Sequence, residues 1–189
     1  MTIFRKRWFA LCLCILVVIL STLINVKVKF GSLVNDVIDI FYYGTEADAG
    51  IYQHLKTISS EAQKLILLGE EYNVDEELIN DVEDSVEWLQ ESIEYSRGYE
   101  NYIYENYQEI QNSLLKLQTA LKRASLTSDD IALLSDCNLT IDNEKAAIES
   151  SDYNTAVRSF LKKYNHFPTA QLSNAAGVSM PKLFDRISF

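Results

Sequence analysis

The chain has 189 residues, 48% of them hydrophobic, with only two prolines, six glycines and three cysteines. This composition fits one domain and excludes a wholly disordered chain, a disulfide-stapled scaffold and a fold of many short strands, which needs more turn residues. Residues 1–29 contain five Lys or Arg and no acid, whereas residues 30–189 carry 12 basic and 27 acidic groups, a charge of −15 that disfavours nucleic acid as a partner.

The N-terminal segment has the features of a membrane span. Arg5, Lys6 and Arg7 precede an uncharged apolar run over residues 8–26, and Lys27 and Lys29 follow it. Nineteen residues of helix extend roughly 28 Å, close to the roughly 30 Å hydrocarbon core of a bilayer. Because the larger basic cluster stays inside, we expect a cytoplasmic N-terminus and an exported body in a single-pass protein.

A cleaved signal peptide is the alternative interpretation of this segment. Signal peptides have a shorter apolar core and a cleavage site of small residues. The run here is long, and residues 22–25 (Thr-Leu-Ile-Asn) offer no such site. An uncleaved anchor is therefore the favoured prediction.

Helical spacing of apolar residues continues through the rest of the chain. From Phe30 to Tyr43 the spacing predicts an extension of the anchor helix, which Gly44 ends, and residues 44–50 form a polar connector. A helix follows from Ile51, with Gly69 at a core position where another helix can approach closely. Its predicted inward residues are Ile51, Leu55, Ile58, Ala62 and Leu65.

Two further helices follow with the same kind of stripe. One begins at Asp75 and ends near Arg97-Gly98, and its predicted inward residues are Leu78, Val82, Val86, Leu89 and Ile93. The next has steps of 4 and 3 over nearly three heptads, which is the pattern of a bundle seam. Its predicted inward residues are Ile103, Tyr107, Ile110, Leu114, Leu117, Leu121 and Ala124, with Tyr99 one step earlier.

The last long helix opens at a capping pair, Thr127 and Asp130. Its apolar stripe changes phase near Asp152, and Pro168 ends it. A short helical turn follows from Thr169 to Ala176, and Gly177 is placed to cap it. The predicted inward residues are Ile131, Leu134, Cys137, Ile141 and Ile148, then Tyr153, Val157, Phe160 and Tyr164.

These patterns predict an all-α fold: an N-terminal transmembrane helix followed by an antiparallel bundle of four long helices. The expected organisation is a cytoplasmic N-terminus and anchor at 1–29, a juxtamembrane helix and connector at 30–50, and the helical bundle at 51–189. One of the bundle helices can be continuous with the anchor.

Two surface features are candidates for binding a partner. Eleven acidic residues and no basic one lie between Glu70 and Glu94, which is the ordinary pattern of a solvated helix face or, alternatively, a docking surface for a basic partner. Five tyrosines lie between Tyr95 and Tyr107, of which two point away from the predicted seam. The predicted partner surface consists of Glu76, Glu83, Glu87, Tyr102 and Tyr104.

No sequence motif of catalysis or cofactor binding is present. The chain lacks G-x-S-x-G, H-E-x-x-H, a P-loop, G-x-G-x-x-G and the EF-hand loop. Its two histidines, His54 and His166, have no partner at metal-ligand spacing. We therefore predict no catalytic residues, no metal, no cofactor and no enzymatic activity.

The C-terminal end resembles that of the LemA family. The pattern is a Tyr-Asn pair, a Val-Arg pair, a Phe-Pro break, a glycine and a closing aromatic, and the residues that carry it are Tyr153, Asn154, Val157, Arg158, Phe160, Phe167, Pro168, Gly177 and Phe184. The match covers about the last 35 residues, and Val178 replaces the family's aromatic, so the resemblance is to a divergent member. It implies a short cytoplasmic N-terminus, one anchor and an extracytoplasmic bundle of long antiparallel helices.

The motif residues are expected to be structural. One turn apart, Asn154 and Arg158 can bond backbone groups freed where Pro168 breaks the helix, while Phe160, Phe167 and Phe184 close the bundle end. The expected function is binding or scaffolding of another envelope protein. The alternative is a sensor or small-ligand-binding ectodomain with its pocket at the Tyr95–Tyr107 end.

Overall fold

The computed structural model describes residues 2–95 and 100–184, with side chains from residue 8 onward except those of residues 96–101 and 185–189. In these ranges the chain is helical and has no strand, so the all-α prediction is confirmed. The helices are α1 (Thr2–Tyr43), α2 (Ile51–Glu71), α3 (Glu76–Tyr95), α4 (Glu100–Leu121), α5 (Ser128–Ser150), α6 (Asp152–Tyr164) and α7 (Thr169–Ala175). The predicted helix end at Arg97-Gly98 and the core position Tyr99 lie outside the described residues.

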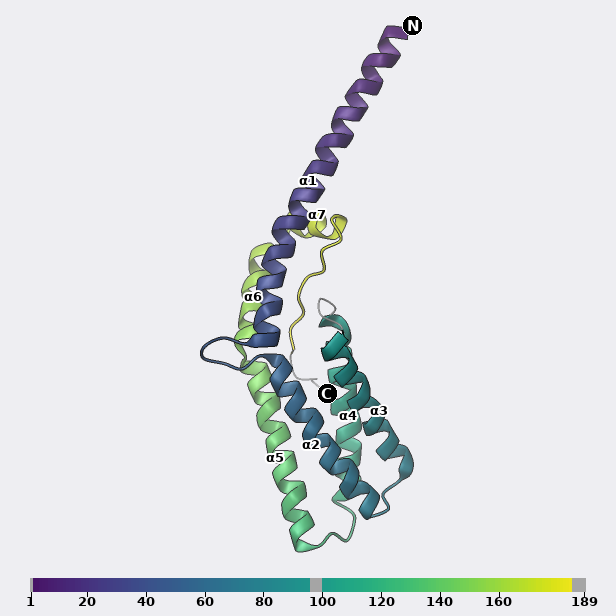
Figure 1. Cartoon of the computed structure of the whole chain (residues 1–189), viewed down its shortest axis with the longest axis vertical. Helices are drawn as coiled ribbons and strands as arrows, with labels where there is room; N and C mark the ends of the chain where they lie inside the picture. Colours follow the sequence, from purple (N-terminus) through teal and green to yellow (C-terminus); the bar gives the residue numbers. More distant parts are fainter. Residues whose placement is uncertain (1, 96–99, 185–189) are drawn as a thin grey trace.

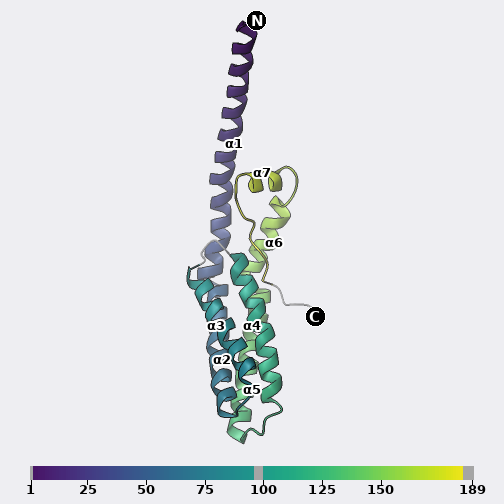
Figure 2. The ribbon, with the colours of Figure 1, turned by 90° about the vertical axis from the view of Figure 1, so that its right-hand side faces the viewer.

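The molecule is a long rod with two tiers (Figure 1). Helices α2, α3, α4 and α5 pack together as the antiparallel four-helix bundle, which is the lower tier in Figure 1. In the upper tier the C-terminal part of α1 packs against α6 and α7. The N-terminal half of α1 projects beyond both tiers, as both views show (Figure 2).

Helix α1 is long and apolar enough to cross a membrane. An 18-residue stretch of it has a mean hydropathy of 2.8, and none of that stretch is buried within the molecule. The buried residues of α1 lie toward its C-terminus and are Phe30, Val34, Val37, Ile38 and Phe41. The helix therefore has an uncovered apolar half and a half that belongs to the folded body, as the spacing predicted.

The predicted seam of the bundle is buried. In α4, six of the seven predicted inward residues are at most 1% exposed: Ile103, Tyr107, Ile110, Leu114, Leu117 and Leu121. The five predicted residues of α2 are wholly buried as well. A Cβ on Gly69 would lie 3.3 Å from Ile79 Cγ1 and Leu117 Cδ1, so this glycine does let α3 and α4 approach α2 closely.

One inward prediction, Ile131, is wrong, and three predicted inward residues, Leu78, Ala124 and Tyr164, are only partly buried. Ile79, rather than Leu78, is the buried residue of the first turn of α3. Ile131 is 56% exposed, because the first turn of α5 lies at the open end of the bundle, and Ala124 is only partly buried because α4 ends at Leu121. The cap itself is as predicted, since Thr127 Oγ1 accepts a hydrogen bond from Asp130 N at 3.3 Å.

The two tiers meet where two helices break side by side. Helix α1 ends at Tyr43. The next residue, Gly44, has a φ of +69°, in the left-handed region, and a Cβ there would clash with Asp48 O at 2.2 Å. The phase change near Asp152 is a break at Ser151, whose Oγ accepts from Asn154 N at 3.2 Å and caps α6. The 44–50 connector is tied to this break, because Asp152 N donates to Asp48 Oδ2 at 2.9 Å. Helix α1, which contains the predicted anchor, is thus not continuous with a bundle helix.

Three residues of the C-terminal motif, Tyr153, Asn154 and Phe184, meet at this junction. Asn154 is wholly buried and donates from Nδ2 to Ile148 O at 2.7 Å and to Phe184 O at 2.9 Å, and its Oδ1 accepts from Phe184 N at 2.8 Å. It therefore bonds the α5–α6 break and the C-terminal segment, and the predicted role at Pro168 is wrong. The ring of Phe184 lies 5.3 Å from that of Phe41 and 5.9 Å from that of Tyr153.

The other motif residues have separate environments. Val157 and Phe160 are buried against the upper tier, and Phe160 contacts Phe30 edge to face at 6.0 Å. Pro168 precedes α7, and Gly177 ends it with a φ of +69°. Phe167 is 79% exposed, so it does not close the bundle end as predicted, and Arg158 is exposed too.

Replacing a seam leucine should destabilise the bundle far more than replacing its neighbour. We expect Leu114→Ala to lower the free energy of unfolding by about 2–5 kcal/mol, because it leaves a cavity in the core. Leu115 is 55% exposed, and Leu115→Ala should change it by less than about 0.5 kcal/mol. Denaturant unfolding of the full chain in detergent, followed by circular dichroism, measures both; equal losses would contradict the buried seam.

Removing the Asn154 amide should release the C-terminal segment. We expect Asn154→Ala to cost about 3 kcal/mol, because each buried backbone group left without a partner costs about 1–3 kcal/mol. Proteolysis should then cut within residues 178–184 faster than in the parent. Asn174→Ala, at an exposed position of α7, is the control. Unchanged cleavage in Asn154→Ala would contradict the junction described above.

Candidate functional site

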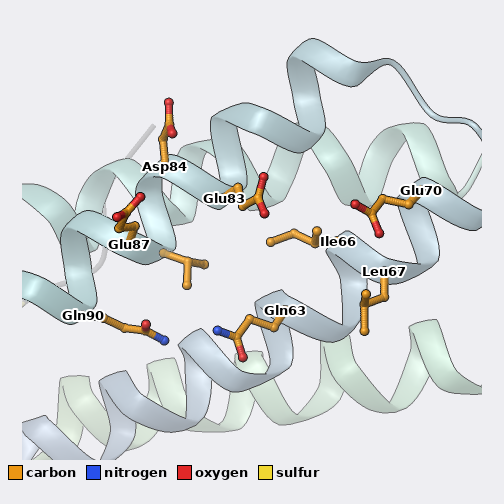
Figure 3. A pocket seen from close by; sticks show the side chains of 9 residues that line it. Gln63, Ile66, Leu67, Glu70, Glu83, Asp84, Glu87 and Gln90 are labelled. Atoms are coloured by element: carbon orange, nitrogen blue, oxygen red, sulfur yellow. The ribbon is translucent and has the colours of Figure 1, made fainter.

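An open groove of about 530 Å³ lies between α2 and α3 (Figure 3). Its floor is apolar: Ile66 and Val86 are 6% and 4% exposed and face the gap between the helices. Leu67, also in the lining, is 64% exposed. Gln63 and Gln90 point toward each other at one end of the groove in Figure 3.

The helix hairpin that forms the groove is fixed by a tight turn. Asn73 has a φ of 50°, a left-handed conformation that asparagine tolerates better than most residues. Asp75 Oδ1 then accepts from Glu77 N at 3.1 Å at the start of α3. This turn places the second half of α2 against the first half of α3, and so brings the two walls of the groove together.

The rim of the groove is negative. Glu70, Glu83, Asp84 and Glu87 line it and are exposed, and no Lys, Arg or His is among its lining residues. Nearby lysines pair elsewhere: Lys64 Nζ lies 2.7 Å from Glu61 Oε1, and Lys116 Nζ lies 3.3 Å from Asp81 Oδ2. An apolar floor with carboxylates around it suits an apolar side chain flanked by cations.

The structure separates the predicted partner surface into four places. Glu83 and Glu87 lie together at the groove, whereas Glu76 is exposed at the start of α3, outside it. Tyr102 is 62% exposed and lies elsewhere, between α3 and α4. Tyr104 is partly buried, and its ring packs edge to face on Phe184 at 5.4 Å.

Sequence reasoning missed the α2 wall of the groove. Leu67 does not belong to the inward stripe of α2. An apolar residue outside that stripe is expected to be exposed, so the sequence could have identified Leu67 as part of a binding surface. The sequence could not identify Gln63 and Ile66, because the helix that lies opposite them is determined by tertiary packing.

A smaller hollow of about 280 Å³ lies at the other end of α3 and α4. Its lining includes the exposed rings of Trp88, Tyr95 and Tyr102. Two of its polar groups already bond to helix carbonyls: Ser92 Oγ donates to Leu89 O at 2.8 Å and Asn106 Nδ2 donates to Trp88 O at 3.1 Å. The hollow therefore offers fewer groups for orienting a small ligand than its lining implies.

Within the described ranges, no three His, Cys, Asp or Glu side chains are arranged to hold a metal ion. His54 Nδ1 lies 2.5 Å from Glu144 Oε2 and joins α2 to α5. Cys137 is 1% exposed, and burial, followed by its contact with Glu61, raises the pKa of this thiol to about 11. A thiol in this state is a poor nucleophile at neutral pH.

Comparison of the chain with protein-family models, curated proteins and solved structures finds no match.

Cys137 should make the fold sensitive to alkali. Its ordinary pKa is 9.0, so between pH 9 and about 11 the thiol ionises in the unfolded chain but not in the folded one, and stability falls as pH rises. We expect the stability advantage over Cys137→Ala to shrink by on the order of 2 kcal/mol between pH 8 and 11. Urea unfolding of both proteins, with serine at positions 12 and 14, measures it. A constant difference would show that the thiol ionises equally in both states.

Proposed function

We propose that this chain is a membrane-anchored, extracytoplasmic helical-bundle protein of the LemA type, which binds or scaffolds another envelope protein. The groove between α2 and α3 is the binding surface in this proposal, and its occupant is a segment with an apolar side chain flanked by lysines or arginines. The observation that carries the proposal is the combination of a floor at Ile66 and Val86 with a rim of four carboxylates and no cation.

The membrane part of the proposal rests on α1 and on charge. The uncovered apolar stretch of α1 can span a bilayer, and the basic cluster before it outnumbers the lysines after it. This favours an inside N-terminus and an outside body. The LemA part rests on the C-terminal motif, several of whose residues meet at the junction of the two tiers.

The polar groups of the groove and of the smaller hollow favour binding of a protein partner over sensing of a small ligand. Two polar groups of the smaller hollow are already engaged with backbone, whereas the groove carries exposed carboxylates on an extended face. Charge complementarity of this kind speeds association with a basic partner and weakens at high salt.

One labelling experiment tests both the orientation and the groove. Leu67→Cys and Leu115→Cys, each with serine at positions 12 and 14, place a thiol on the groove or on the outer face of α4; the two leucines have exposures of 64% and 55%. Intact cells are treated with a membrane-impermeant, photoactivatable maleimide and then irradiated. We expect both proteins to be labelled and only the groove variant to give discrete crosslinks, which Glu83→Gln with Glu87→Gln should reduce.

The two parts of the proposal fail separately in this design. Labelling that requires permeabilised cells would overturn the outward orientation. Labelling in intact cells with the same crosslinks from positions 67 and 115 would overturn the groove as the binding surface. Glu76→Gln with Glu77→Gln, outside the groove, is the matched charge control.

A further inference from the structure

The corner between α6 and α7 lies at the level where the apolar stretch of α1 meets the folded body. Helix α7 packs directly against α1, and both views place it beside the middle of that helix (Figures 1 and 2). Val26, the last residue of the apolar run, is partly buried against the core, and Lys27 and Lys29 follow it. In the proposed anchoring, this corner is at the membrane surface.

The charge of this corner is opposite to that of the rest of the body. Residues 162–177, which form this corner, contain two lysines, Lys162 and Lys163, and no Asp or Glu, whereas residues 70–94 contain eleven acids and no base. Lys162 and Lys163 lie in the last turn of α6 and are exposed, and Lys29 is exposed on α1. Cations placed at this level face the phosphates of a lipid surface.

Exposed apolar side chains accompany these cations. Phe167 is 79% exposed in the loop between α6 and α7, although Phe160 and Phe184 are buried. Leu172 of α7 is 36% exposed. An aromatic and a leucine beside lysines are the composition of segments that lie in the interfacial layer of a membrane.

We propose that the α6–α7 corner is a second membrane contact of this protein. Lys162 and Lys163 bind the phosphates of anionic lipids, and Phe167 and Leu172 enter the interfacial layer of the leaflet from which α1 emerges. The inference rests on the proposed anchoring by residues 8–26. Its consequence is that the body is held at two points and cannot swing freely about α1.

Depth-dependent quenching of single tryptophans tests this contact. Three full-length proteins are reconstituted in phosphatidylcholine–phosphatidylglycerol vesicles whose acyl chains carry bromine near the headgroups. One keeps Trp8 in the span, one keeps Trp88 on the bundle, and the third carries Phe167→Trp with phenylalanine at positions 8 and 88. We expect strong quenching at positions 8 and 167, at least about twofold greater than at 88.

A matched pair of variants tests the contribution of Lys162 and Lys163 to this contact. Lys162→Gln with Lys163→Gln should reduce quenching at position 167 by about half, and phosphatidylcholine alone should have the same effect. Lys122 and Arg123, an exposed basic pair at the other end of the bundle, are the control; Lys122→Gln with Arg123→Gln should leave quenching unchanged.

The possible outcomes distinguish failure of the anchor from failure of the second contact. Quenching at position 8 with position 167 no more quenched than 88 would overturn the second contact and leave the anchor intact. No quenching at position 8 would overturn the anchor and the inference with it. If quenching at 167 is unchanged both by the lysine substitutions and by removal of the anionic lipid, then Lys162 and Lys163 do not bind anionic headgroups.

Discussion

The packing of Phe184 against three helices determines how the bundle is placed relative to α1. Its ring is wholly buried and lies 5.3 Å from Phe41 of α1, 5.9 Å from Tyr153 of α6 and 6.0 Å from Tyr107 of α4. Asn154 fixes the backbone of the same residue by two hydrogen bonds. Without this contact the tiers would be joined mainly by a seven-residue connector and the break at Ser151. The position of the groove relative to the apolar stretch of α1 depends on it.

Helical periodicity was sufficient to predict the bundle because each long helix buries one continuous stripe. A step of 3 or 4 residues identifies the stripe of α4 from Ile103 to Leu121 without knowledge of its neighbours. Errors arose where burial depends on what lies opposite. Leu78 and Ile79 are adjacent and equally apolar, and the turn into α3 decides which of them faces α2. Ile131 continues the stripe of α5 but lies beyond the end of the helices that would cover it.

The candidate site was only partly predictable for the same reason. Charge density singled out Glu83 and Glu87, but the α2 wall opposite them appears only when the hairpin is folded. Likewise, the C-terminal motif identified Asn154 as structural, whereas its main partner is 30 residues away at Phe184. Phe167 and Phe184 look alike in sequence, yet one is 79% exposed and the other wholly buried. Periodicity reports the face of a helix and cannot place residues in loops and extended segments.

The distribution of charge along the rod separates two kinds of electrostatic interaction. In the proposed orientation the basic corner at α6 and α7 lies at the lipid surface. The groove lies roughly 45 Å farther out, if residues 27–43 of α1 and the first 15 residues of α2 are each taken at about 1.5 Å per residue. This is several times the Debye length of about 8 Å at physiological salt, so the lipid charge does not reach the groove. A basic partner is therefore attracted to the groove by the acidic residues of the body and not by the lipid, and it must itself extend this far from the membrane to reach them.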